Sequence, residues 1–417
     1  MSTKKPLIVI TLIWLGWFLV LYGFQYLVSE RLVLKRPDYA VSWTEKETTI
    51  IANRGKVYLL EPFLNRQVAW DSEYYVGIAV GGYDDPAAGT VVNPATGQPV
   101  IKNYSFFPLY PYVMKAFMFP LQIFGLNPIA TASLAGVVVG LLGTLAGLIA
   151  LWDLGRETLD ESARLRAVFY ILIFPTGFFL AQVYTEGLFI GLAFWSLALT
   201  RRKQWLWASL LAVLAAWTRA HGAALVLPLL VACLAALDRK KPLLKQLNWK
   251  WFAQLLCALL PVGAYLLWRY SALGQGWAEL QSFYFGRGLM SLESSLGSWK
   301  SAYEYARGPL IGGQGIVYFG LEVFTILLAL VAALWLLRRA PGVALFSLGV
   351  IVLSVFSGSA QSMARYMLVA PATYLFLGRL GRSQAFDRSW TVLSLLLGFI
   401  GYTTVADLLR ILQSLVA

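Results

Sequence analysis

The stretch Pro6–Leu27, PLIVITLIWLGWFLVLYGFQYL, carries no charged residue over its 22 positions. An α-helix of that length rises about 33 Å, which is enough to cross a hydrocarbon core of about 30 Å. Lys4 and Lys5 precede it. A signal peptide would have a shorter apolar core and a small-residue cleavage site, and neither is evident before Gln25. We therefore expect this helix to stay in the mature protein as a first membrane span.

The rest of the chain continues this pattern. Of its 417 residues, 59% are hydrophobic and only 13% are charged, a balance that excludes a set of soluble domains. Ten more apolar stretches lie at 128–152, 167–185, 187–200, 204–218, 220–237, 251–268, 313–337, 341–358, 364–378 and 389–406. In the first of these, glycines recur at helical spacing, which predicts close helix packing. The sequence thus predicts an all-α polytopic membrane protein with about eleven transmembrane helices.

Basic residues predict which ends of these helices face the cytoplasm. The formal net charge is +13, and in membrane proteins basic residues gather in short cytoplasmic connections. Positive charge there also fits contact with anionic membrane lipids. A nucleic-acid-binding protein typically combines a run of basic residues with a soluble fold. This sequence shows no such combination, so we expect no nucleic-acid partner. The clusters lie at Arg201–Lys203, Arg239–Lys250, Arg338–Arg339 and Arg379–Arg388.

The same alternation places two long loops, 29–127 and 269–312, on the extracytoplasmic side. The first has about 100 residues, which is too long for a mere connector. Within it, 106–126 is apolar enough to span the membrane, but counting it as a span would invert every later connection. We therefore expect an interfacial or re-entrant helix there, interrupted by prolines.

A short amphipathic helix is also expected in the first outer loop, at about 69–80. Trp70, Tyr74 and Ile78 follow one another at helical spacing, and they form a face suited to resting on lipid. Asp71 lies at the edge of that face, where it can meet both a lipid-borne and a water-borne group. A carboxylate in that position suits a general base, and the alternative is an ordinary solvated acid.

Two arginines, Arg219 and Arg365, lie between apolar stretches and close to the hydrocarbon. An ionisable residue there is costly, which indicates either a function or a buried ion pair. Each guanidinium has the geometry to bind a lipid phosphate, with Glu186 as a partner for one of them. Structural salt bridges within the bundle, or snorkelling to the surface, are the alternative. His221, the only histidine, suits either contact with a substrate or a structural hydrogen bond.

Five ordered segments link these residues over about 60–380: Trp70–Ser72 followed by Ile78–Ala79 and Gly82–Tyr83, then Phe106–Pro111, Ala181–Glu186, Thr218–Gly222, and Arg365–Tyr366 with Pro371. As an ordered set they resemble the signature of the glycosylphosphatidylinositol mannosyltransferase II family, the PIG-V-like proteins. His221 stands where that family would have asparagine. The compact loops favour a prokaryotic homologue.

This resemblance implies a GT-C glycosyltransferase, usually inverting, that moves mannose from a polyprenyl-phosphate mannose donor to an extracytoplasmic glycolipid or glycan acceptor. Asp71 would be its catalytic base, within a variant of the family's Asp-x-Asp pattern. No cofactor and no metal ion is expected. The active site would face outward from a bacterial plasma membrane, or lie in the endoplasmic reticulum membrane of a eukaryote. Its substrate-binding residues would be Trp70, Glu73, Tyr184, Glu186, Arg219, His221 and Arg365.

Two other interpretations stay open. A transferase of another sugar, or of a whole lipid-linked glycan, would share the prenyl phosphate of its donor and leave the same pattern. A lipid or solute transporter would also use arginines and an acid near the membrane. Transporters typically show paired repeats with broken helices near the midplane, whereas this sequence has its acids in a large outer loop.

Overall fold

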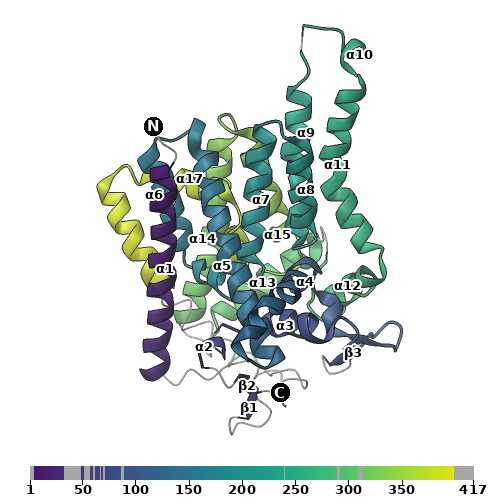
Figure 1. Ribbon diagram of the computed structural model, residues 1–417, viewed down its shortest axis with the longest axis vertical. Coiled ribbons are helices and arrows are strands. Elements are labelled where there is room, and N and C mark those ends of the chain that lie inside the picture. Colours follow the sequence, from purple (N-terminus) through teal and green to yellow (C-terminus); the bar gives the residue numbers. More distant parts are fainter. Residues whose placement is uncertain are drawn as a thin grey trace.

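The computed structural model of the chain is shown in Figure 1. It describes residues 4–31, 48–50, 57–59, 62–65, 67–68, 71–85, 89–238, 240–288, 292–308 and 313–398. Helices dominate it. The strands form two small antiparallel hairpins, β1 (Thr48–Ile50) with β2 (Val57–Leu59), and β3 (Thr90–Val92) with β4 (Pro99–Ile101). The prediction of an all-α fold is confirmed.

Long apolar helices form the body of the molecule. Within the described ranges, four of them are long and apolar enough to cross a membrane: α1 (Lys4–Arg31), α5 (Pro128–Leu154), α11 (Trp249–Arg269) and α14 (Gly313–Leu336). Shorter helices run beside them in Figure 1, which makes the chain a polytopic membrane protein. These are α6 (Glu161–Leu172), α7 (Glu186–Arg201), α8 (Trp205–Ala216), α9 (Val226–Ala235), α15 (Pro341–Val355) and α17 (Pro371–Leu380). Residues 384–398 are also helical.

Two of the expected spans are broken rather than continuous. In 167–185, α6 ends at Leu172, and a 3-10 turn, η6 (Gly177–Ala181), follows Pro175. In 364–378, the short α16 (Met363–Met367) is separated from α17, which begins at Pro371. Proline lacks the backbone N–H that a continuing helix needs, so each helix stops before it. Irregular backbone at membrane depth is tolerated where protein or a cavity surrounds it.

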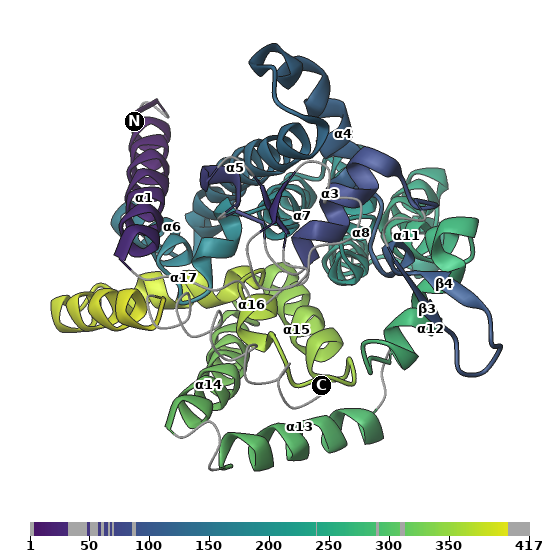
Figure 2. The same cartoon turned by 90° about the horizontal axis from the view of Figure 1, so that it is seen from below.

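The described segments of the stretch 29–127 gather at one end of the bundle, with α12 (Ala272–Phe283) and α13 (Leu292–Ala306). The short helix α10 (Leu243–Gln246) lies at the opposite end in Figure 1. Figure 2 views the first end from below, where α3 and α16 lie near its middle and α12 lies beside β3 and β4. The loop's own helices are α2 (Pro62–Asn65), α3 (Asp71–Gly81), η3 (Lys102–Ser105), α4 (Leu109–Leu121) and η4 (Gln122–Phe124). The remaining turns are η5 (Gly155–Glu157) and η7 (Ala220–Leu225).

Helix α3 packs against protein, and the expectation that its face rests on lipid is wrong for the residues described. Ile78 is fully buried, and Tyr74 stacks on Phe106 with a centroid distance of 4.7 Å. Trp70, the third member of that face, lies outside the described residues. The reason is that the loop folds back over α5, so Ile78 joins a core cluster with Tyr110 and Met114 of α4.

Helix α4 occupies the middle of the stretch 106–126. Its 13 residues rise about 20 Å, which is too short to cross a hydrocarbon core of about 30 Å. Tyr110 and Met114 are fully buried, while Phe119 near its carboxyl end is exposed, as are Ile123 and Phe124 of the following turn η4. One part of this apolar segment is therefore covered by protein and another part is uncovered.

Glycines allow α5 and α7 to cross at very short distance. A side chain at Gly143 of α5 would begin 2.6 Å from the carbonyl oxygen of Gly187 in α7. This crossing confirms the prediction that the glycines of α5 serve close packing. It also fixes the position of Glu186, the first residue of α7, against the body of the protein.

Replacing Gly143 with alanine should lower the thermal unfolding temperature of the purified protein in detergent. The added methyl group meets backbone, which cannot move as a side chain could, and overpacking of this kind costs about 1–3 kcal/mol. Gly320→Ala in α14 is the matched control, because nothing lies within 4 Å of its added methyl group. Equal unfolding temperatures for the two variants would contradict the close crossing.

Candidate functional site

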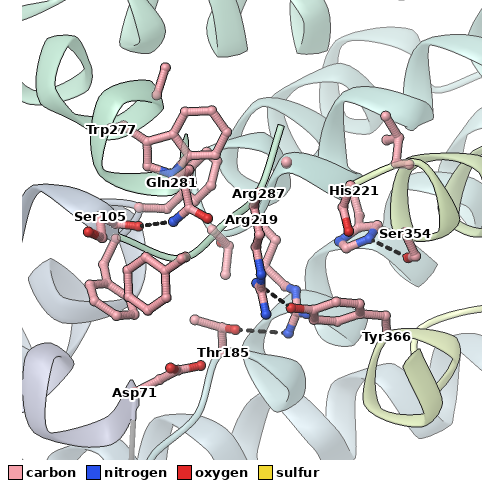
Figure 3. Close-up of a pocket in the computed structure, with 18 of the residues that line it drawn as sticks. Asp71, Ser105, Thr185, Arg219, His221, Trp277, Gln281, Arg287, Ser354 and Tyr366 are labelled. Atoms are coloured by element: carbon pink, nitrogen blue, oxygen red, sulfur yellow. Dashed lines mark hydrogen bonds between the residues drawn. The ribbon is translucent and has the colours of Figure 1, made fainter. Parts of the chain in front are cut away.

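A cavity of about 430 Å³ opens among the segments that meet at one end of the bundle. Figure 3 shows its lining side chains. They come from parts of the chain that are far apart in sequence: the start of α3, the η3–α4 connection, the α8–η7 turn, α12 and its carboxyl end, and α15–α16. The cavity is therefore a product of the tertiary fold, and each of the five ordered segments found in the sequence contributes to its lining.

Asp71 is the first residue of α3 and stands at the wall of this cavity. Its Oδ2 accepts a hydrogen bond from Nη1 of Arg365 at 3.1 Å. The Asp71 side chain keeps 27% of its surface exposed, and no described residue donates a hydrogen bond to its other oxygen, Oδ1. One carboxylate oxygen is thus held in place while the other stays available to a ligand.

Glu186 lies directly behind the cavity wall and joins two arginines. Its carboxylate forms an ion pair with Arg219, and its Oε1 lies 3.3 Å from Nε of Arg365. Thr185 accepts a further hydrogen bond from Nη1 of Arg219 at 3.1 Å. The Glu186 side chain is 0% exposed, so the carboxylate exchanges its water shell for these two guanidinium groups.

Tyr366 organises the guanidinium groups from another side. Its ring centroid lies 5.3–5.6 Å from the central carbons of Arg219, Arg287 and Arg365. The Tyr366 hydroxyl accepts a hydrogen bond from Nη1 of Arg287 at 2.6 Å. These contacts hold three cations near one another, as Figure 3 shows for Arg219 and Arg287, through cation–π attraction and hydrogen bonding.

The lining of the cavity carries more positive than negative charge. Four arginines line it, namely Arg219, Arg269, Arg287 and Arg365, and Asp71 is the sole carboxylate among the described residues that do so. Even with Glu186 counted, four guanidinium groups face two carboxylates. An excess of fixed guanidinium groups in a recessed site favours an anionic ligand, and phosphate matches their geometry.

Tyr75 is the other ionisable residue that α3 contributes to the lining. Burial, together with the nearby carboxylate of Asp71, raises the pKa of Tyr75 far above its usual value of 10. Its hydroxyl therefore stays protonated at neutral pH and cannot serve as a base. On this wall of the cavity, Asp71 is left as the group able to accept a proton.

His221 lines the cavity as a neutral acceptor. Ser354 donates its hydroxyl hydrogen to the carbonyl of Val350 at 2.7 Å, so it must accept from Nε2 of His221, 2.9 Å away. The ring then carries its hydrogen on Nε2, and Nδ1 keeps a lone pair with no partner among the described groups. Gly222 makes this turn possible, because a side chain there would collide with the backbone of Ala215.

Glu322 was not singled out in the sequence, although it holds part of the site. It lies within α14 and is almost completely buried. Its carboxylate accepts the backbone N–H groups of Ser362 at 2.9 Å and Ala364 at 2.5 Å. Ser362 has a φ of 64°, in the left-handed region that non-glycine residues rarely adopt. Glu322 thus stabilises the strained turn that presents Arg365.

The residues predicted from the sequence to form the site do not all line the cavity. Asp71, Arg219, His221 and Arg365 all line the cavity. Glu186 and Tyr184 lie behind it, and the Tyr184 ring is 5.2 Å from the guanidinium of Arg365. Glu73 belongs to α3 but does not line the cavity, and Trp70 is outside the described residues.

Sequence reasoning missed several lining residues, among them two that organise the charged part of the cavity. Arg287 lies in a stretch without helical periodicity, so only its charge beside aromatic residues could have drawn attention. Tyr366 was noted as part of a segment, but nothing in the sequence indicated that it would contact three arginines. In the part of the chain that the structure describes, no three His, Cys, Asp or Glu residues are grouped as a metal site.

Changing Glu322 to glutamine should reduce the free energy of unfolding by about 1.5–3 kcal/mol, the usual contribution of hydrogen bonds to a charged group. The amide keeps the shape but offers one acceptor oxygen to two N–H groups. Glu304→Gln is the control, since Glu304 forms an exposed pair with Lys300 and should change stability by less than about 1 kcal/mol. Denaturant unfolding in detergent measures both, and a loss no larger than the control's would refute the proposed support.

No protein-family model matches the chain, and the search of curated proteins found no match. Among solved structures, the chain is similar to ArnT from Cupriavidus metallidurans bound to undecaprenyl phosphate, with a TM-score of 0.45 and 16% identity over 77% of this chain and 57% of that one. It is also similar to the Archaeoglobus fulgidus oligosaccharyltransferase in its apo form, with a TM-score of 0.43 and 11% identity over 99% of this chain and 56% of that one. The chain thus covers just over half the length of these two proteins.

Proposed function

We propose that this chain is a membrane glycosyltransferase that moves a sugar from a polyprenyl-phosphate donor to a hydroxyl group of an acceptor. One observation carries the proposal: a carboxylate with an unoccupied oxygen, on Asp71, shares a cavity with an excess of guanidinium groups. A base for the attacking hydroxyl and cations for a departing phosphate are the two requirements of such a transfer.

The arginines supply the phosphate half of the site. A polyprenyl-phosphate sugar carries one negative charge on its phosphate, and the leaving phosphate gains more as the sugar departs. Arg219 and Arg365 are already fixed by Glu186, and Arg287 by Tyr366. Because these groups need little reorganisation, they stabilise the growing charge more than flexible surface cations would.

Asp71 supplies the base for the attacking hydroxyl group. Arg365 holds Oδ2, which leaves Oδ1 to accept the hydrogen bond of an acceptor hydroxyl. The hydroxyl oxygen attacks the anomeric carbon of the donor and passes its proton to Asp71, while the bond from that carbon to the phosphate oxygen breaks and its electron pair leaves with the polyprenyl phosphate. A single displacement of this kind inverts the anomeric centre. The phosphate is a good leaving group, so the step requires no added acid.

The arrangement of charged connections supports an outward-facing site. The N-terminus and α10, whose neighbouring residues are basic, lie at the end opposite to α3 and α12 in Figure 1. Positively charged connections belong to the cytoplasmic side. On this basis loops 29–127 and 269–312 lie outside, α4 rests on the outer surface of the membrane, and a bacterial plasma membrane is the proposed location.

Mannose is proposed as the sugar because five ordered segments resemble the PIG-V-like mannosyltransferases. Each of these segments contributes to the lining of one cavity, including Asp71, Arg219 and Arg365, which supports their working together. Transfer of another prenyl-linked sugar or of a whole glycan would need the same base and the same cations. A donor series that varies only the sugar separates these possibilities.

Asp71→Asn should lower the rate of mannose transfer from radiolabelled polyprenyl-phosphate mannose to a membrane lipid extract by about 10²–10⁴-fold, since the amide cannot accept the proton. Glu73→Gln is the matched control on the same helix, and it should keep at least half of the activity because Glu73 does not line the cavity. Wild-type rates in Asp71→Asn would sink the assignment of the base. Vectorial movement of an unmodified substrate by the wild type would favour a transporter instead.

Arg287→Ala should raise the KM for the lipid-linked donor by roughly 10- to 100-fold, the effect of losing one charge-assisted hydrogen bond to phosphate. Arg307→Ala is a close control, because Arg307 also donates to a tyrosine hydroxyl, that of Tyr303, but does not line the cavity. Steady-state kinetics with varied donor measures both variants. If the KM rises equally in both, the loss reflects general surface charge and Arg287 is not a phosphate ligand.

A further inference from the structure

The cavity has a second end that the arginines do not account for. It is formed by Ser105 and Phe107 of the first outer loop, Tyr265 near the end of α11, and Trp277 and Gln281 of α12. In Figure 3, Trp277 and Gln281 lie on the side of the cavity opposite Asp71. A ligand held there would extend toward the free oxygen of the carboxylate.

Aromatic rings at this end are fixed at defined angles. Phe107 stacks on Trp268 with a centroid distance of 4.1 Å, and Trp277 meets Phe107 edge to face at 5.7 Å. Tyr265 closes the group at 6.4 Å from Phe107. Rings packed on their neighbours present rigid apolar surfaces to a cavity at a low entropic cost, as aromatic binding sites do.

Polar groups lie among these rings. The Gln281 carboxamide donates to the carbonyl of Ser105 at 3.2 Å, and its oxygen accepts no hydrogen bond from the described residues. The Ser105 hydroxyl is buried and has no partner among them. Buried polar groups in native proteins are normally paired, so an unpaired hydroxyl on a cavity wall indicates a position for a ligand group.

We infer that this end of the cavity, formed by Phe107, Trp277, Gln281 and Ser105, is a subsite for the ring of a neutral sugar. A pyranose has one face of C–H groups, which pack on aromatic rings, and a rim of hydroxyl groups, which pair with a carboxamide and a serine hydroxyl. None of the residues named for this end, Ser105, Phe107, Tyr265, Trp277 and Gln281, carries a charge at neutral pH, and one N–H of Arg269 is directed to the carbonyl of Gly274 at 3.2 Å. A neutral ligand fits these surroundings better than a second anion.

A prenyl chain fits this end poorly. Its wall includes hydroxyl and amide groups, which hydrocarbon would leave unpaired. Its segments belong to the end of the bundle where α3, α4 and α12 gather, away from the middle of the long helices (Figure 1). The inference rests on the proposed function only in naming this sugar as part of the acceptor, which would then be a glycan rather than a bare phospholipid head group.

The test is saturation-transfer difference NMR of the purified wild-type protein in detergent with methyl α-D-mannopyranoside. Transfer to the ring C–H protons is expected, and the open-chain polyol sorbitol should show much less. Trp277→Ala should weaken binding by roughly tenfold, while Trp277→Phe, which keeps a ring, should retain most of it. Trp249→Ala is the control for loss of a tryptophan, because Trp249 is 82% exposed on α11.

Equal signals for the pyranoside and sorbitol, or unchanged binding in Trp277→Ala, would overturn the subsite. This measurement needs no donor and no turnover, so its outcome is separate from that of the transfer assay. If the protein transfers sugar but does not bind the pyranoside at this end, the subsite is refuted and the glycosyltransferase proposal is retained. If the protein binds the pyranoside but transfers no sugar, the subsite is retained and the glycosyltransferase proposal is refuted.

Discussion

The site depends on one buried carboxylate. Glu186 is fully enclosed and pairs with both Arg219 and Arg365, so two guanidinium groups can stand at the wall of a cavity among apolar helices. A buried cation without a counter-charge would be strongly destabilising. With Asp71 paired to Arg365 as well, two carboxylates balance these two guanidinium groups, and the excess positive charge of the lining belongs to Arg269 and Arg287.

Broken helices bring these groups together. The break after α6 leads into Glu186 at the start of α7. The break between α8 and α9 puts Arg219 in the cavity lining, and the break before α17 puts Arg365 there. Close packing of α5 on α7 then holds Glu186 in place, and Glu322 holds the turn that carries Arg365. The chemistry proposed for Asp71 needs all of these supports, because a loosely held guanidinium would stabilise a leaving phosphate less.

Sequence patterns predicted the helical class and marked Arg219 and Arg365 as candidates for a site or a buried ion pair, because charge within apolar stretches is a local property. Sequence patterns did not identify contacts between residues that lie far apart along the chain. Glu322 binds backbone groups about 40 residues away, and Arg287 meets a tyrosine 79 residues further on. The face of α3 was assigned to lipid because periodicity shows that a face is apolar but not what covers it, and here protein covers Ile78.

The central claim is that the cavity binds the phosphate of a prenyl lipid. Native mass spectrometry of the purified protein with equal amounts of polyprenyl phosphate and the matching polyprenol tests it without any assumption about the sugar or the acceptor. The excess of guanidinium groups over carboxylates predicts that the phosphate form is retained at least about tenfold better, the effect of one or more charge-assisted hydrogen bonds. Equal retention of the two lipids would contradict the account.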